Sequence, residues 1–349
     1  MARVHTLTDA DSDRGIRRIL TRSLQSGHIN YLIGSGASCP AVPIAGSIEQ
    51  EIAALYEAKK VNEGTAKMYD FIASIQGPTN ELIAGTADNA DIAETVRDYT
   101  DYIGIIERIL ANRWTNILPK RATIFSTNYD LFIEKAALCY PTLRLNDGFI
   151  RVPNLDGRVE FSSRTFFTAT SDTGNLYNYK VEIPCINLIK LHGSFSWKKD
   201  GDSILYEVKR KELLSDEQRA PEQLDQFLKD YAVVLPQATK FRTTLMDRTY
   251  YELLRIFANE LDRENVLLIA FGFSFGDEHI FQITKRALKN PTLRLVAFAF
   301  DTAAREALLA KFEGYHNVDI VAPEEGTHID FQRFNELFGR CLPRIGRPQ

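Results

Sequence analysis

Residues 29–38 read INYLIGSGAS, an apolar run that ends in a glycine-rich turn. A run of this length, rich in β-branched and aromatic residues and closed by glycine, is typical of a buried strand. Five further runs have a similar character: Ala122–Ser126, Ile186–Leu191, Val266–Phe271, Leu293–Phe300 and the short Val318–Val321. Strands that are apolar on both faces are typical of parallel sheets that helices cover on both sides.

Helical patterns, with apolar residues three and four positions apart, lie between several of these runs. They cover Arg14–Ser26, Glu49–Lys60, Ala90–Asn112, Asp130–Leu138, Thr249–Arg263, Glu278–Lys289 and Thr302–Phe312. Alternating strands and helices predict an α/β fold, a Rossmann-like doubly wound and mainly parallel sheet. We expect one domain over 1–349, with core segments at about 28–48, 120–140, 185–198 and 264–325. A helical insertion is expected at about 49–119, and mixed insertions at about 140–185 and 198–250.

The composition of the 349 residues is that of a globular protein, with 44% hydrophobic and 25% charged residues. The 42 basic and 46 acidic residues give a net charge of -4, so no overall positive field favours direct binding to nucleic acid or an anionic membrane. The four cysteines include no CxxC pair, which argues against a structural zinc site. Because no secretion signal or long apolar stretch is present, we expect a cytoplasmic protein without a membrane span.

The turn after the first strand comprises Gly34, Ser35, Gly36, Ala37 and Ser38. Glycines here allow the backbone to approach a pyrophosphate, and the N-terminus of a following helix supplies N–H donors. The dinucleotide-binding pattern GxGxxG is incomplete, because Cys39 occupies the third glycine position. A tight turn between a strand and a helix is therefore the alternative interpretation.

Polar residues Thr127, Asn128 and Asp130 follow the second strand. Side chains at the carboxyl end of a strand in an α/β sheet point into the crevice where ligands bind. The Asn128 amide can hold a ribose hydroxyl or an attacking water. Asp130 can support Asn128 or cap the next helix.

The third strand is followed by His192 and Gly193. A histidine in this place can act as a general base or bind a ribose hydroxyl, and the alternative is a buried histidine with a purely structural role. The position of His192 beside two other polar strand ends favours the functional interpretation.

The fourth strand ends in a turn that holds Gly272, Ser274, Gly276 and Asp277. Ser274 can bind phosphate, and Asp277 can bind a ribose or cap the next helix. The spacing also matches the GxSxG nucleophile elbow of serine hydrolases, with His316 or His328 downstream. Little chain remains after this turn for the loops that would carry the acid and the histidine.

Together the four turns resemble those of the sirtuin family. The family's GAGxS turn is similar to Gly34–Ser38, its TQNID motif to 126–130, its HG pair to His192 and Gly193, and its late NAD-binding turn to 272–274. The absence of a CxxC…CxxC module is a departure from the deacylases of this family. In this respect the chain resembles the zinc-free bacterial branch that hydrolyses NAD in defence against phage.

This resemblance implies cleavage of NAD to nicotinamide and ADP-ribose without a metal ion. It implies that Asn128 and His192 are catalytic. The residues expected to bind NAD are Gly34, Ser35, Gly36, Ala37, Ser38, Thr127, Asp130, Gly272, Ser274 and Asp277.

The resemblance also implies regulation by assembly, as a homo-oligomer or with a helicase-like ATPase partner. Two other functions stay open. One is an NAD-dependent protein deacylase or ADP-ribosyl transferase, and the other is a non-catalytic module that binds NAD or ADP-ribose.

Overall fold

The computed structural model describes residues 2–8, 13–86, 89–113, 118–173, 180–201, 203–233 and 244–342. A central sheet with the order β1-β12-β11-β10-β2-β3-β7-β4 runs through these residues, and every neighbouring pair is parallel. The strands are β1 (Arg3–Leu7), β2 (His28–Ile33), β3 (Arg121–Ser126), β4 (Arg144–Asn146), β7 (Cys185–Lys190), β10 (Val266–Phe271), β11 (Arg294–Phe298) and β12 (Val318–Pro323). The predicted doubly wound parallel fold is confirmed.

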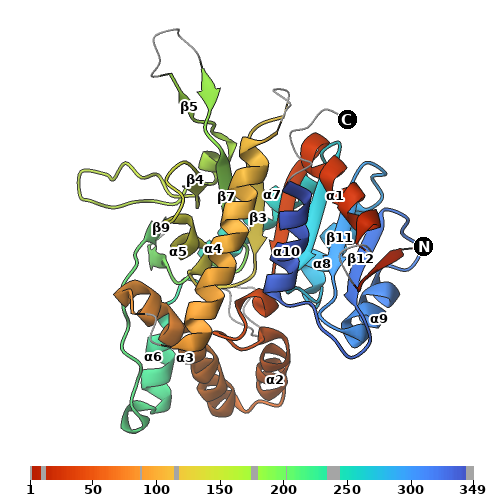
Figure 1. Cartoon of the computed structure of the whole chain (residues 1–349). Helices are drawn as coiled ribbons and strands as arrows, with labels where there is room; N and C mark the ends of the chain where they lie inside the picture. Colours follow the sequence, from red (N-terminus) through yellow and green to blue (C-terminus); the bar gives the residue numbers. More distant parts are fainter. Residues whose placement is uncertain are drawn as a thin grey trace.

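Helices cover both faces of the sheet (Figure 1). One face carries α1 (Arg14–Ser26), α4 (Ala90–Ala111), α5 (Phe132–Ala137) and α10 (Phe331–Cys341), and the other carries α7 (Thr244–Leu261), α8 (Glu278–Ala287) and α9 (Thr302–Lys311). Tyr31 of β2 packs edge-on against Tyr102 of α4, with ring centroids 5.3 Å apart. On the opposite face, Phe125 of β3 packs against Phe257 of α7 at 4.8 Å. Burial on both faces explains the apolar strands.

Three helices extend the molecule beyond the sheet, at the bottom of Figure 1. They are α2 (Ala45–Glu57), α3 (Val61–Ala84) and α6 (Pro221–Lys229). Tyr69 of α3 contacts Phe227 of α6, with ring centroids 5.1 Å apart. Two small antiparallel pairs, β5 (Ser171–Asp172) with β6 (Val181–Glu182) and β8 (Trp197–Asp200) with β9 (Ser203–Tyr206), lie in the mixed segments. Residues 87–88, 114–117, 174–179, 202 and 234–243 of the expected insertions lie outside the described residues.

Several elements differ from the sequence-based expectation. The sequence did not predict β1, β4 or α10. Strands β1 and β4 are short, contain polar residues and lie at the edges of the sheet, where only their partner strands order them. The helix expected from Glu49 begins at Ala45 and ends at Glu57, since Lys59 takes a positive φ of 58°. The helix expected from Asp130 begins at Phe132, whose N–H donates to the Asp130 carboxylate (3.3 Å).

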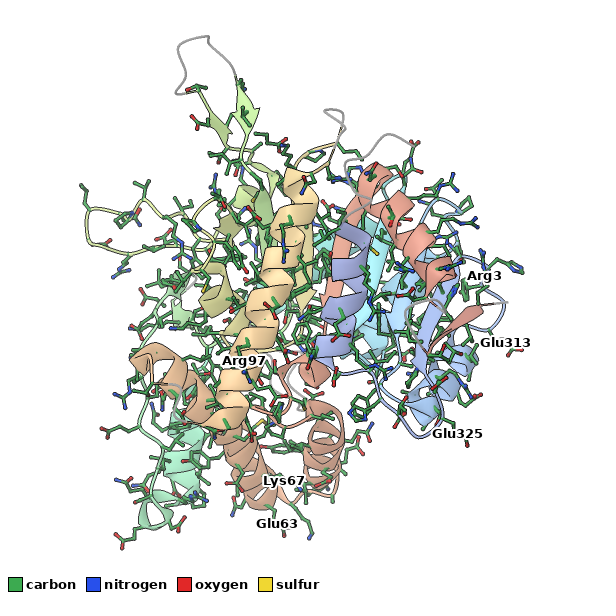
Figure 2. The ribbon with its side chains drawn as sticks, in the orientation of Figure 1. Arg3, Glu63, Lys67, Arg97, Glu313 and Glu325 are labelled. Atoms are coloured by element: carbon green, nitrogen blue, oxygen red, sulfur yellow. The ribbon has the colours of Figure 1, made fainter. Side chains whose placement is uncertain are left out.

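The outer surface carries charges of both signs. Arg97 on α4, Glu63 on α3, and Glu313 and Glu325 near the ends of α9 and β12 are exposed (Figure 2). Among the described residues, no helix is both long enough and apolar enough to cross a bilayer. The same residues contain no group of three or more His, Cys, Asp and Glu side chains that could hold a metal ion.

Strand β2 lies where the winding direction of the sheet reverses. Its neighbours are β3, which follows it in the chain, and β10, which the chain reaches only after the insertions. In doubly wound sheets, ligands bind outside the carboxyl ends of the strands at such a switch point. The fold therefore predicts a ligand site at the turns that follow β2, β3, β7 and β10.

Candidate functional site

The turns after β10, β2, β3 and β7 lie side by side at one edge of the sheet. The register pairs Phe271 with Ile33, Ile33 with Ser126, and Ser126 with Lys190, so the four strands end at the same level. All four motifs that the sequence singled out therefore meet at the switch point.

The two glycine turns pack directly against each other. The N–H of Gly34 donates to the Phe271 carbonyl (3.1 Å), and that of Gly36 donates to the Gly272 carbonyl (3.0 Å). A Cβ atom on Gly34 would lie 2.4 Å from the Gly272 carbonyl oxygen. Gly272 has a φ of +62°, and a Cβ there would lie 2.4 Å from the Ala37 nitrogen. Close backbone contact between the two turns therefore accounts for Gly34 and Gly272 without a bound phosphate.

Gly272→Ala is expected to lower the free energy of unfolding by about 2 kcal/mol or more, because it combines backbone strain with a steric clash. The measurement is urea unfolding followed by circular dichroism. Gly46→Ala is the matched control, because Gly46 lies in α2 with no atom within 4 Å of its Cβ position. Equal stability of the two variants would show that the close contact between the turns is not required.

The turn after β2 does not lead directly into an α-helix. Ser35–Ser38 form a four-residue 3-10 helix, and α2 begins only at Ala45. Cys39 is extended because it precedes Pro40, a position that disfavours helical backbone. The N–H of Ala37 is already donated to the Gly34 carbonyl (3.0 Å). Phosphate binding by residues 34–38 stays a prediction.

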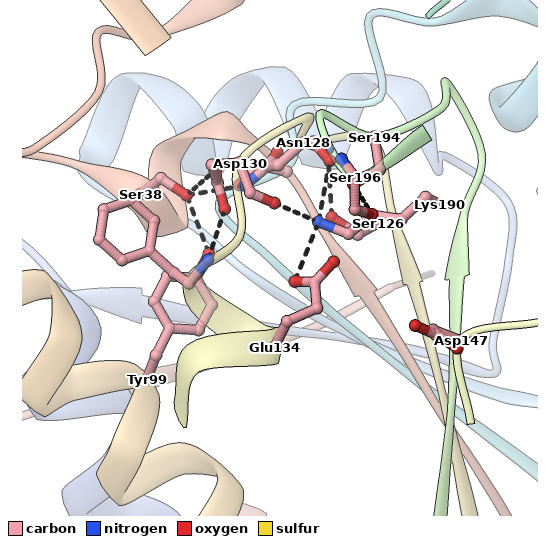
Figure 3. A network of polar contacts seen from close by, with 12 residues as sticks. Ser38, Tyr99, Ser126, Asn128, Asp130, Glu134, Asp147, Lys190, Ser194 and Ser196 are labelled. Carbon is pink, nitrogen blue, oxygen red and sulfur yellow. Dashed lines mark hydrogen bonds and ion pairs between the residues drawn. The ribbon is translucent and has the colours of Figure 1, made fainter. Parts of the chain in front are cut away.

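The Asn128 side chain lies at the centre of a buried polar network (Figure 3). Its Nδ2 donates to the Gly34 carbonyl and to Ser38 Oγ, both at 3.0 Å. Ser38 Oγ donates its single proton to the Asp130 carboxylate at 2.7 Å. The Tyr99 hydroxyl, 2.9 Å from Ser38 Oγ, must then act as the donor in that contact. The acceptors around Nδ2 therefore determine which way the amide faces.

This network leaves one atom of Asn128 free. Its Oδ1 is buried and has no hydrogen-bond partner in the described structure. A buried carbonyl oxygen without a partner costs free energy unless a ligand or water satisfies it. Asn128 is therefore prepared to accept a hydrogen bond from a hydroxyl or a water molecule. Ser38, which we expected to contact NAD, is fully buried and accepts a hydrogen bond from Asn128; its contact with NAD stays a prediction.

His192 is paired with Asp277 from the next motif. The Nε2 atom of His192 lies 3.1 Å from Asp277 Oδ2. Asp277 also caps α8, because its carboxylate accepts from the Ile280 N–H at 3.0 Å. The His192 side chain is 12% exposed, and its ring lies 6.0 Å from that of Tyr250 on α7. Asp277 therefore caps α8, one of its two expected roles, and also pairs with His192; binding of a ribose by Asp277 stays a prediction.

The electrostatics of this pair favour an ionised Asp277. Burial raises the pKa of Asp277, but its hydrogen bonds with His192 and the Ile280 N–H, together with the charges of His192 and His279, outweigh that effect and leave the pKa below its usual value. The carboxylate can only accept a proton, so the hydrogen bond requires the proton to sit on Nε2. Nδ1 is then the ring nitrogen that can take up a proton from a ligand.

A pH dependence of stability follows from the lowered pKa of Asp277. Its stabilising contribution is present above the unfolded-state pKa of about 4 and is lost as the pH falls through the lower folded-state value. We expect Asp277→Asn to be less stable than the wild type at pH 7, with a difference that shrinks below about pH 4. Urea unfolding of both proteins at pH 7 and pH 3 measures this difference. A gap of the same size at both pH values would contradict the ionic pairing.

Asn128 and His192 occupy equivalent places on adjacent strands. Each lies two residues beyond a residue of the paired register, Ser126 in β3 and Lys190 in β7. Neighbouring strands are about 4.8 Å apart, so the two residues lie at the same edge of the sheet on adjacent strands. Glu49 of α2 lies close enough to His192 and Asp277 to be affected by their charges. Burial raises the pKa of Glu49, the charge of His192 lowers it and the charge of Asp277 raises it.

Sequence reasoning missed Tyr99, Tyr250 and Glu49. Each lies within a helix whose amphipathic pattern already accounts for the residue, and no motif distinguishes it. A hollow of about 620 Å³ lies between α2 and α3, with Ile48 and Phe71 among its walls. Phe71 contacts Tyr129 of the β3 turn, with ring centroids 6.2 Å apart. The helical segment thus forms a wall behind the Asn128 turn.

The serine-hydrolase interpretation gains no support from the contacts at Ser274. Ser274 is exposed on the turn before α8. The ring of His328 lies against Phe300, with centroids 5.2 Å apart. A nucleophile elbow requires a histidine in contact with its serine. Binding of the adenosine half of NAD by Ser274 stays a prediction.

A comparison with protein families matches a model described as a SIR2-like domain to residues 122–320. The match covers 199 of the 349 residues and includes the turns that carry Asn128, His192 and Asp277. No curated protein matches the chain.

Proposed function

The chain belongs to the SIR2-like domain family, and on this basis we propose that it is an NAD glycohydrolase. The family supports an NAD-related activity. The finer proposal, conversion of NAD and water to nicotinamide and ADP-ribose, depends chiefly on the unpartnered Oδ1 of Asn128. The His192–Asp277 pair at the same sheet edge supplies a proton acceptor.

The proposed reaction breaks the bond between the nicotinamide nitrogen and the ribose carbon C1. Both bonding electrons leave with nicotinamide, so positive charge develops on the ribose, and the oxygen of water then bonds to C1. Asn128 Oδ1 accepts a hydrogen bond from this water or from a ribose hydroxyl. An acceptor that is already oriented costs no reorganisation at the moment of reaction.

His192 takes up the proton that the water releases. It accepts this proton at Nδ1, directly or through a ribose hydroxyl, and becomes an imidazolium ion. The Asp277 carboxylate at Nε2 stabilises that ion and holds the ring in the required tautomer. A positioned general base of this kind contributes about 10²–10⁴-fold to a rate.

Incubation of the purified chain with NAD, followed by chromatography, tests the proposal. Equal amounts of nicotinamide and ADP-ribose are expected without any acylated peptide. Product that forms only when an acetyl-lysine peptide is added would indicate a deacylase instead. Calorimetric binding of NAD or ADP-ribose without turnover would indicate a binding module.

We also propose that this activity depletes NAD during bacterial defence against phage, under the control of assembly. The similarity of the four turns to the zinc-free defence branch supports this role. We expect cellular NAD to fall on phage infection of cells that express the wild type but not Asn128→Ala. Size-exclusion chromatography of the purified chain alone tests for a homo-oligomer. The same experiment with a helicase-like ATPase encoded beside the gene tests for that partner.

A further inference from the structure

Lys190, the last residue of β7, is a lysine inside the protein. Every residue of β7 is buried, and the Lys190 side chain is only 3% exposed. Lysine is almost never buried without partners, because removing its charge from water costs several kcal/mol. The partners of Lys190 therefore indicate what its burial achieves.

Within the part of the chain that the structure describes, the polar partners of the Lys190 ammonium come from one short segment, residues 128–134 (Figure 3). Its Nζ donates to the carbonyl of Asn128 at 3.2 Å and to that of Asp130 at 2.5 Å. The Glu134 carboxylate, on the first turn of α5, lies 3.6 Å away. Burial raises the pKa of Glu134 to about 7, and the charge of Lys190 opposes that rise.

The Tyr129 carbonyl, which lies between those of Asn128 and Asp130 in the chain, is bound by the same part of the chain as its neighbours. The N–H of Phe195 donates to the Tyr129 carbonyl at 3.0 Å. Three consecutive carbonyls of the Asn128 turn are thus held by residues 190–195, the segment that carries His192. Without a cation, the carbonyls of Asn128 and Asp130 would face each other's partial negative charge in a buried place.

We propose that Lys190 is a positioning residue that holds the Asn128 turn in register with His192. Glu134 keeps the ammonium in place on the side away from the carbonyls. The catalytic part of this inference rests on the proposed NAD hydrolysis. Its structural part, that the ammonium orders residues 127–134, stands independently.

Lys190→Met is expected to lower kcat for nicotinamide release by about 100-fold, because a displacement of 1 Å at a reacting group has an effect of that size. The KM for NAD is expected to change little, since Lys190 is enclosed by protein. Lys190→Arg retains charge and donors, so we expect it to recover part of the rate. Lys198→Met is the matched control, because Lys198 is 49% exposed and pairs with Glu207 at the surface.

Hydrogen–deuterium exchange of the peptide covering 127–134 gives a second readout that needs no activity. We expect faster exchange there in Lys190→Met than in the wild type or Lys198→Met, at a temperature where all three are folded. An active wild type with unchanged kcat and exchange in Lys190→Met would overturn the inference and leave the hydrolase intact. A wild type without NAD turnover, both alone and with the proposed ATPase partner, would reject the proposed function, and the exchange data would still decide whether Lys190 orders the turn.

Discussion

Asn128→Ala is expected to reduce kcat for nicotinamide release by about 10²–10³-fold, the usual effect of removing one oriented polar group from a reacting centre. The variant loses the free Oδ1 acceptor and also the Nδ2 donor that binds Ser38 and Gly34. Chromatography of nicotinamide at saturating NAD measures kcat, and the thermal transition shows whether the variant is folded.

Two further variants separate the amide from its surroundings. Ser38→Ala removes an acceptor that orients Nδ2 while the free Oδ1 stays present, so we expect a smaller loss than for Asn128→Ala. Asn112→Ala is the control, because Asn112 is exposed at the end of α4 and donates to the nearby Arg108 carbonyl. A folded Asn128→Ala protein with the wild-type rate would rule out the proposed role of the amide.

His192→Ala is expected to lower kcat by about 10²–10⁴-fold, the range for loss of a positioned general base. The imidazole is replaced by a methyl group, and Asp277 keeps its cap of α8 through the Ile280 N–H. The helix is therefore expected to stay in place, so a loss of rate reports on proton transfer. The measurement is the same nicotinamide assay across pH 5 to 9.

Asp277→Asn distinguishes orientation of the ring from its basicity. An amide at this position can still contact the ring, but it no longer stabilises the imidazolium ion, so we expect a smaller loss than for His192→Ala. His279→Ala, on the same turn of α8 but exposed, is the control. Wild-type kcat in a folded His192→Ala protein would contradict the general-base role.

The hydrophobic pattern of the sequence was sufficient to predict the central strands of the sheet. The run at 266–271 is apolar at every position, and those at 29–33 and 122–126 are interrupted only by Asn30, Thr123 and Ser126, a composition typical of a strand covered on both faces. The parallel direction then brings the residues after each run to one edge. For this reason Asn128 and His192 were recognised as neighbours although 64 positions separate them.

The local sequence pattern was insufficient to predict elements and contacts that depend on a partner far along the chain. The polar strand β1 exists only because it pairs with β12, more than 300 residues away. His192 and Asp277 meet because β7 and β10 end at the same level on either side of β2 and β3. Contacts across such distances leave no periodicity in the sequence.

The sequence by itself determined the parallel α/β sheet and the four polar turns at its edge, since burial and strand direction follow from local composition. Only the tertiary structure decided what each turn residue does. It placed Ser38 behind Asn128, assigned Asp277 to both His192 and the α8 cap, and enclosed Lys190 among backbone carbonyls. These roles depend on which atoms lie within about 3 Å of one another, and that is a property of packed elements rather than of residue order.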